Sequence, residues 1–288
     1  MFIRVNHDGY GDGLLGAPPA SFKKGGLPVN EGDAHHLLTI LEGRSSYQPY
    51  LTRAMANRAT TVPKKFLRIV TSLSQVPKHL RHLFVSHGGR MTGGTIDRWT
   101  RTVYVLPAPG LRAETRLEYA LHECVHLFAH PHAPTQQSCP RPCIGAFQAE
   151  FGTGFGEGLT QVITEDIMDQ QGISLNPHDR PYEDFAAVMR AVVPVFGIDP
   201  MARAYFFGDV ASLRASMEAR WGANNLRAVT LHTSAGSKKR VLDWIPILEA
   251  AHKARMEAEE AQRKRLKELI RTSPRGDFPT PTRERYLV

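Results

Sequence analysis

Two histidines and a glutamate with a defined spacing lie in the segment LEYALHECVHLFAH. His122, Glu123 and His126 form the pattern HExxH. The surrounding apolar residues recur at helical spacing, so a helix would place both imidazoles one turn apart on the same face. Two neutral imidazoles in this arrangement can bind one zinc ion, and the glutamate between them can take a proton from water bound to that ion. The pattern therefore predicts chemistry in which Zn²⁺ activates a water molecule.

A catalytic zinc site needs a third protein ligand and an open fourth position. Glu157 is one candidate, because it lies in GFGEGLTQ, where a glycine-rich stretch opens a helix that can bring a carboxylate to the metal. His132 is the other, because its spacing matches HExxHxxGxxH. However, Ala129 occupies the position where glycine normally permits a sharp turn. The sequence favours Glu157 and leaves His132, His130 and the cysteines as alternatives.

Hydrolysis of a carbonyl compound also needs a hydrogen-bond donor for the tetrahedral intermediate, usually a tyrosine or a histidine. Tyr182 and Tyr205 are the candidates downstream of the motif, followed by His178 and His232. The strand predicted at Thr102 to Leu106, just before the motif helix, is expected to offer an edge for backbone pairing with an extended peptide.

The segments HECVH and EGLTQ resemble the gluzincin type of zinc metallopeptidase, in which a glutamate on a second helix completes a two-histidine site. The resemblance implies that His122, His126 and Glu157 are zinc ligands and that Glu123 is the general base. It also implies a zincin-like fold with the metal in the cleft between the two helices.

The resemblance covers residues 93–209 and is strongest to small bacterial members, several of which are toxin or injected-effector peptidase domains. One position departs from the family. Many gluzincins carry an acidic residue four positions after the third ligand to orient a histidine, and this chain has Gln161 there. An amide accepts that hydrogen bond more weakly than a carboxylate does.

The fold class predicted from the chain is α+β, predominantly helical, with a small β-sheet before the active-site helix. Apolar residues at Phe66, Ile69, Val70 and Leu73 predict a helix. Short β-rich segments between residues 81 and 106 predict strands, with a glycine-bearing turn near Met91 to Thr95. Further helices are expected at Glu114 to Phe128, Phe155 to Gln171, Tyr182 to Phe196, Pro200 to Phe207, Asp209 to Trp221 and Leu242 to Ile270.

Changes in composition divide the chain into three parts. Residues 1–30 are rich in glycine and proline and predict an irregular N-terminal arm. Residues 31–240 hold the predicted catalytic domain. Residues 241–288 predict a charged helix followed by a proline-rich tail.

The overall composition is that of a globular protein, with 42% hydrophobic and 22% charged residues. A net charge of +8 attracts anions without identifying one, and no nucleic-acid-binding motif is present, so no specific nucleic-acid partner is expected. No run of about 18 apolar residues predicts a membrane span. The start, MFIRVNHDGYGDG, is not typical of a signal peptide. We therefore expect a protein that is cytoplasmic in the producing cell or exported by a dedicated secretion system.

These observations predict a zinc metallopeptidase that acts on a protein or peptide substrate. The resemblance adds a bacterial toxin or secreted effector role, with an immunity protein or the secretion machinery as a further partner. The alternative is a non-catalytic zinc-binding or docking module with the same fold. In that case a fourth protein ligand such as Cys139 would close the site.

Overall fold

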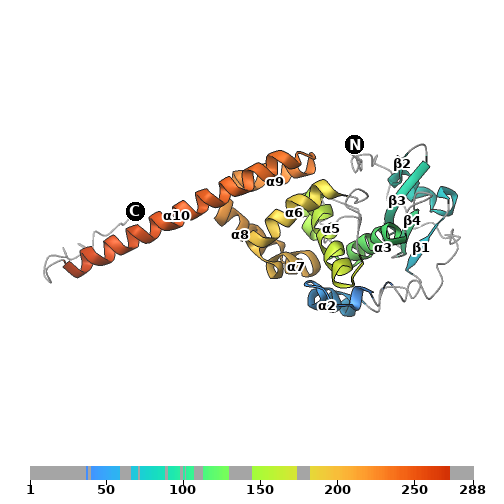
Figure 1. Cartoon of the computed structure of the whole chain (residues 1–288), viewed down its shortest axis with the longest axis horizontal. Helices are drawn as coiled ribbons and strands as arrows, with labels where there is room; N and C mark the ends of the chain where they lie inside the picture. Colours follow the sequence, from blue (N-terminus) through green and yellow to red (C-terminus); the bar gives the residue numbers. More distant parts are fainter. Residues whose placement is uncertain are drawn as a thin grey trace, which may run out of the picture. The chain divides into compact units, whose positions relative to one another are not determined.

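The computed structural model describes residue 37 and residues 40–58, 66–70, 72–87, 90–97, 100, 102–106, 113–129, 145–173 and 182–272. Helices make up most of this part of the chain, together with one small β-sheet (Figure 1). The chain divides into two compact units, Met1–Asp243 and Trp244–Val288. The last helix, α10 (Lys238–Thr272), begins in the first unit and continues through the second.

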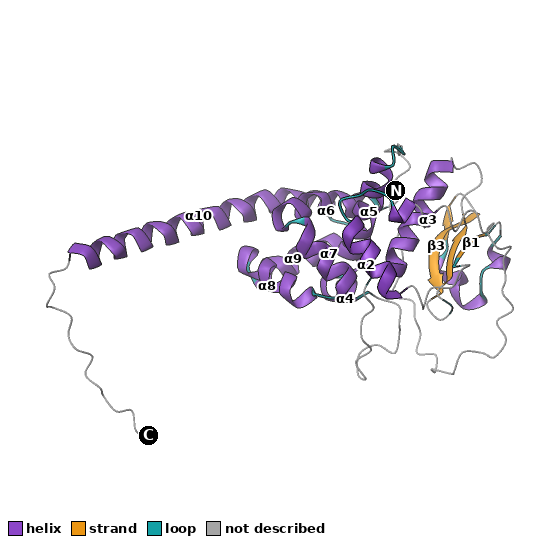
Figure 2. Ribbon diagram, turned by 90° about the horizontal axis from the view of Figure 1, so that it is seen from below, coloured by secondary structure: helices purple, strands orange, loops and turns teal. Residues whose placement is uncertain are grey.

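The sheet has four strands in the order β1-β4-β3-β2. Figure 2 shows it in orange, with β1 and β3 labelled. The central strand β4 pairs with β1 in parallel and with β3 antiparallel, and β3 pairs with β2 antiparallel. All residues of β4 are buried, as expected for a short β-branched and aromatic strand between two neighbours. The strands are β1 (Leu67–Ile69), β2 (Val85–His87), β3 (Arg90–Asp97) and β4 (Thr102–Leu106).

Both faces of the sheet are covered. Tyr104 and Leu106 of β4 pack in one cluster with four residues that lie between β1 and β2, near the 3₁₀ helices η1 (Leu73–Gln75) and η2 (Lys78–Leu83). Successive side chains of a strand alternate between faces, so Gly94 and its cross-strand partner Val105 point the other way. On that face the chain packs against the helix that carries the HExxH motif. The four other cluster members are Val70, Val76, Leu80 and Phe84.

The helix α5 (Thr153–Gln170) lies at the centre of the helical part, in contact with four other helices. A helix that is covered on most sides is expected to be apolar, yet α5 buries several polar side chains, among them Glu157 and Gln161. Buried polar groups cost free energy unless they are hydrogen-bonded, and these residues face the motif helix. Besides α10, the other helices are α2 (Gln48–Arg58), α3 (Ala113–Phe128), α4 (Ala146–Phe151), α6 (Glu183–Phe196), α7 (Ile198–Phe207), α8 (Val210–Trp221) and α9 (Ala223–Ser234).

A glycine allows α5 and α6 to pack closely. A Cβ atom at Gly158 would lie 2.5 Å from the carbonyl oxygen of Phe185 and 2.8 Å from its carbonyl carbon. Because helix backbone cannot move aside cheaply, we expect Gly158→Ala to lower the free energy of unfolding by about 1–3 kcal/mol in denaturant titrations. Gly156→Ala is the control: the three atoms nearest to its Cβ would belong to the side chain of Gln148 rather than to backbone, so its loss should be smaller. An equal loss in both variants would contradict this explanation.

The structure confirms a mostly helical chain with a small sheet before the motif helix. The helices predicted from residue 114 to 128 and from 155 to 221 are present with small differences at their ends, whereas α2, α4 and α9 were not predicted. The expected arm at residues 1–30 lies outside the described residues, as does the tail from residue 273. No single helix in the described part is long and apolar enough to cross a bilayer. The helices α6 and α7 meet the criteria of length and composition only when they are taken as a pair, and the chain bends by 114° between them.

Three local predictions were wrong. The segment from Phe66 to Leu73 forms strand β1 and the start of η1 rather than a helix, because so short an apolar run does not distinguish the two. Met91 to Thr95 lie inside β3 rather than in a turn. Thr102 to Leu106 do not form an edge, because β4 is paired on both sides.

Candidate metal centre

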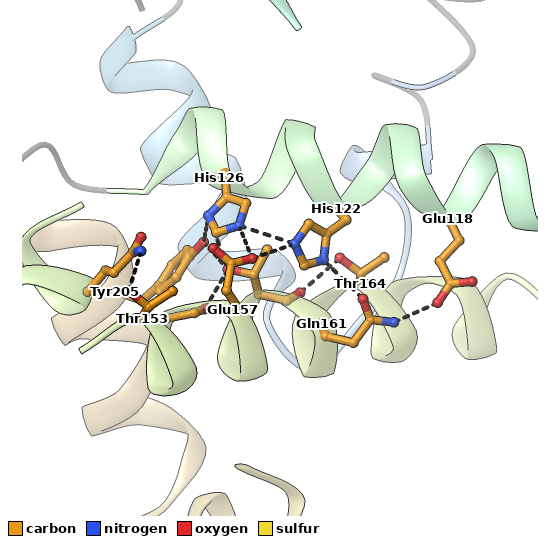
Figure 3. A network of polar contacts seen from close by, with 11 residues as sticks. Glu118, His122, His126, Thr153, Glu157, Gln161, Thr164 and Tyr205 are labelled. Atoms are coloured by element: carbon orange, nitrogen blue, oxygen red, sulfur yellow. Dashed lines mark hydrogen bonds and ion pairs between the residues drawn. The ribbon is translucent and has the colours of Figure 1, made fainter. Parts of the chain in front are cut away.

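Helices α3 and α5 place three potential metal ligands around one point (Figure 3). His122 and His126 come from α3, one turn apart, and Glu157 comes from α5. Nε2 of His122 lies 3.2 Å from Nε2 of His126 and 3.2 Å from Oε2 of Glu157. Nε2 of His126 lies 3.1 Å from the same carboxylate oxygen. The two nitrogens and the oxygen therefore form a nearly equilateral triangle.

The triangle has the dimensions of one face of a tetrahedral zinc site. Zinc–ligand bonds of about 2.0–2.1 Å at tetrahedral angles place neighbouring ligand atoms about 3.3 Å apart, close to the 3.1–3.2 Å seen here. Two imidazoles and one carboxylate are also a ligand set of catalytic zinc. In the described part of the chain, this is the single group of three such side chains close enough to share a metal ion.

The hydrogen bonds of Gln161 fix the proton on His122. Nε2 of Gln161 donates to Oε1 of Glu118 at 2.6 Å and to Oε1 of Glu165 at 3.3 Å. Ionised carboxylates only accept hydrogen bonds. The atom of the Gln161 amide that faces them is therefore its nitrogen, which donates. The amide oxygen then faces Nδ1 of His122 at 3.0 Å and accepts its proton. The neutral imidazole therefore directs the lone pair of Nε2 toward the ligand triangle.

Two hydroxyl groups fix the proton on His126 in the same way. The hydroxyl of Thr160 donates to the carbonyl oxygen of Gly156 at 2.8 Å, so the Tyr205 hydroxyl, 2.7 Å away, donates to the oxygen of Thr160. Both hydroxyl protons are then used. The two oxygens lie 3.3 and 3.4 Å from Nδ1 of His126 and can only accept from it. The lone pair on Nε2 of His126 is therefore free for a metal.

Glu157 is held as a carboxylate. Its side chain is buried, which alone would raise its pKa. Before a metal binds, protonated rings of His126 and His122 attract this carboxylate and donate hydrogen bonds to it, and these effects outweigh burial and lower the pKa of Glu157 below its ordinary value; a metal ion would take the place of those protons on Nε2. The group is thus ionised and able to serve as a metal ligand at neutral pH.

Glu123 lies on the sheet side of α3. It is buried, and its side chain rests on the backbone of β3 at Gly94, where a Cβ atom would come within 2.5 Å of Cγ and 2.8 Å of Oε1 of Glu123. A glycine inside a strand often marks such a close approach. Gly94 therefore provides the space that the candidate general base occupies.

Tyr182 lies directly beside the ligand triangle. Its ring stacks on His122, with the ring centres 4.7 Å apart and the planes at 12°. Burial and then the negative charges of Glu157 and Glu123 raise the pKa of Tyr182 well above its ordinary value, so the phenol stays protonated. Its backbone has a φ of +58°, the single positive value at a non-glycine residue in the described segments. Strain of this kind concentrates at functional sites.

The structure separates the two tyrosines predicted to act in catalysis. Tyr182 is next to both carboxylates, whereas Tyr205 contacts Nδ1 of His126, on the side of the ring that faces away from the ligand triangle. His232 lies on α9. The alternative ligands His130, His132, Cys139 and Cys143, and the donor candidate His178, lie outside the described residues.

Sequence reasoning missed the partners behind the ligands, Glu118, Thr160 and Glu165. A signal was present, because polar residues recur every four positions on both helices: 118, 122 and 126 on α3, and 157, 161 and 165 on α5. Residues four apart share one helix face. The two rows run antiparallel, so Glu118 meets Gln161 and His126 meets Glu157.

No protein-family model, curated protein or solved structure matches this chain. The functional argument therefore rests on the chemistry of the metal centre.

Proposed function

We propose that the protein is a zinc-dependent peptidase with a zincin-like arrangement of its site helices. The observation that supports this most strongly is the convergence of two imidazole lone pairs and an ionised carboxylate at zinc spacing, with a second carboxylate next to them on α3. The three ligands found in the described part of the chain would leave a fourth position for water or substrate, as catalytic zinc requires.

His122, His126 and Glu157 would hold the ion. When bound, zinc supplies a water of lowered pKa and polarises the carbonyl group of the substrate. The carboxylate of Glu123 would accept a proton from the attacking water and pass it to the leaving amine. The Tyr182 phenol, which stays protonated, donates a hydrogen bond to the oxygen that becomes negative during attack. Tyr205 and Thr160 hold the ring of His126 in the ligating tautomer.

Strand β3 offers a place for an extended substrate. Its residues Arg90–Thr92 pair with β2, whereas Gly93–Asp97 pair with β4 on one side only in the described part of the chain. An extended peptide can pair with such a strand through backbone hydrogen bonds. Because Gly94 lies in this stretch and contacts Glu123, a peptide bound there would pass close to the general base. This feature favours a peptide substrate.

The test is hydrolysis of an unbiased peptide mixture by the zinc-loaded full chain, followed by mass spectrometry. New termini should accumulate with the wild type and be absent with Glu123→Gln. If the wild type binds zinc and produces no new termini from peptides or denatured proteins, the non-catalytic zinc module becomes the better reading. A toxin or secreted-effector role, with an immunity protein or secretion machinery as partner, is proposed on the sequence resemblance alone.

Gly94 provides a second test of the base. In Gly94→Ala the new methyl group would overlap Cγ of Glu123 and push its carboxylate aside, while the three ligands are untouched. Since a displacement of about 1 Å can cost about 10²-fold in rate, we expect turnover to fall up to about that much with unchanged zinc content. Thr95→Ser, on the opposite face of β3, is the control. Wild-type turnover in Gly94→Ala would show that this contact does not position Glu123.

A further inference from the structure

Two buried carboxylates converge on the amide of Gln161. Glu118 is 1% exposed, Glu165 is 7% exposed, and Gln161 is fully buried. One carboxylate comes from α3 and the other from α5, and both accept hydrogen bonds from the same amide nitrogen. The other end of that amide accepts the proton on Nδ1 of His122. A chain of hydrogen bonds thus leads from two carboxylates, through one amide, to a metal ligand.

Placing two carboxylates this close in the interior is unfavourable unless partners compensate for it. Part of the compensation comes from α6, where Nε of Arg190 lies 3.7 Å from Oε2 of Glu165. Arg190 is itself held by Glu183 at the start of α6. The 2.6 Å contact between Gln161 and Glu118 is short, as expected for a charge-assisted hydrogen bond.

The carboxylates affect the amide in two ways. They fix its orientation, because a rotated amide would turn its oxygen toward two carboxylate oxygens in place of its N–H groups. They also polarise it, since hydrogen bonds in a chain strengthen one another, so the amide oxygen becomes a better acceptor for His122. A neutral side chain can in this way transmit negative charge to the imidazole.

We propose that Glu118 and Glu165 are positioning residues of the metal centre, which act through Gln161 to hold His122 in its ligating tautomer. The proposal deepens the proposed function in that it concerns the same metal site. The competing explanation is that the carboxylates only hold α3 and α5 together.

Exchanging the carboxylate at position 118 and the amide at position 161 distinguishes these two explanations. In Gln161→Glu the new carboxylate would face Glu118 directly, and in Glu118→Gln the amide of Gln161 keeps an acceptor oxygen but loses the charged carboxylate. When both changes are combined, the amide at position 118 can donate to the carboxylate at position 161, which accepts directly from His122. Arg190 remains next to Glu165 to balance its charge.

The zinc dissociation constant of each full-length variant is measured by competition with a chromophoric chelator. Changes to partners of metal-ligating histidines typically weaken metal binding about 10–100-fold. We expect losses within this range for Glu118→Gln and for Gln161→Glu, and a smaller loss for Glu165→Gln, whose contact is longer. The exchanged double variant should bind zinc more tightly than either single variant. Glu150→Gln, a carboxylate paired with Arg214 away from the site, is the control and should bind as the wild type does.

Thermal unfolding of the zinc-free proteins shows whether each variant folds. If the losses of the two single variants simply add in the exchanged protein, the residues are not coupled through the amide and the proposal is overturned. Wild-type affinity in Glu118→Gln and Glu165→Gln would also overturn it. The readout is independent of peptide cleavage: tight, coupled zinc binding without hydrolysis would contradict the proposed peptidase activity and leave the positioning role intact.

Discussion

Glu123→Gln is expected to keep about one zinc ion per chain and to lose most of the peptidase activity. A general base contributes about 10²–10⁴-fold to turnover, and the amide of glutamine cannot take a proton from water. The side chain keeps its size, so its contact with Gly94 on β3 is retained. His122, His126 and Glu157 are unchanged, so the metal site stays intact. Metal analysis and the turnover number are measured on the same preparation.

The control for Glu123→Gln is a variant that removes a carboxylate with no part in the reaction. Glu218, on the surface of α8 and paired with Arg214, serves this purpose, and Glu218→Gln should keep wild-type turnover. A change in the turnover number with a constant Michaelis constant would show that Glu123 acts in the transition state rather than in substrate binding. Undiminished turnover in Glu123→Gln would exclude it as the base.

The helices around the site were predictable because their apolar residues follow one periodicity over many turns. α3 was predicted within one residue of its observed start, and Pro131 was expected to stop it, shortly after its observed end at Phe128. The sheet was less predictable, because its strands are three to eight residues long, and a glycine pair inside β3 looks in sequence like a turn. The glycine at position 94 leaves room for the side chain of Glu123, which packs on it. This contact joins two segments that are distant in the sequence, so no local sequence pattern predicts it.

The candidate site shows the same difference between local patterns, which the sequence reveals, and contacts between distant segments, which it does not. The two histidines could be identified because one helix carries both, and Glu157 because a similar motif is known from gluzincins. The structure brings the three together. Gln161 was correctly noted as the partner position of a histidine, because its amide oxygen lies 3.0 Å from Nδ1 of His122. Its neighbour Glu118 comes from another helix, and sequence alone does not show which residues of two helices face one another.

This geometry also explains how a neutral residue can stand at a position where an acidic one is common. In the described structure, the carboxylates of Glu118 and Glu165 lie one residue further from His122, and both accept hydrogen bonds from the amide of Gln161. The arrangement places an amide rather than a carboxylate at Nδ1 of His122 while fixing the same tautomer. Burying two acidic side chains is unfavourable in free energy. The ion pair of Glu165 with Arg190 partly offsets this desolvation.

Glu157→Ala is expected to abolish zinc binding. Removal of a charged ligand should weaken affinity more than the about 10–100-fold that loss of an outer partner costs, so dialysed protein should fall from about one zinc ion per chain to almost none. Peptidase activity should fall with it. Glu157 lies on α5, whose other contacts with α3 remain, so zinc-free Glu157→Ala should still unfold cooperatively. Metal content is measured by mass spectrometry on protein purified without added zinc.

His132→Ala provides the matched control, because His132 is the ligand that the alternative HExxHxxGxxH spacing would use. With Glu157 as the third ligand, His132→Ala keeps its zinc. The opposite pattern, with zinc retained in Glu157→Ala and lost in His132→Ala, would move the third ligand to His132 and would require α3 to be followed by a sharp turn at Ala129. Loss of zinc in both variants would indicate a fourth protein ligand and a closed site, which favours the structural zinc module over a peptidase.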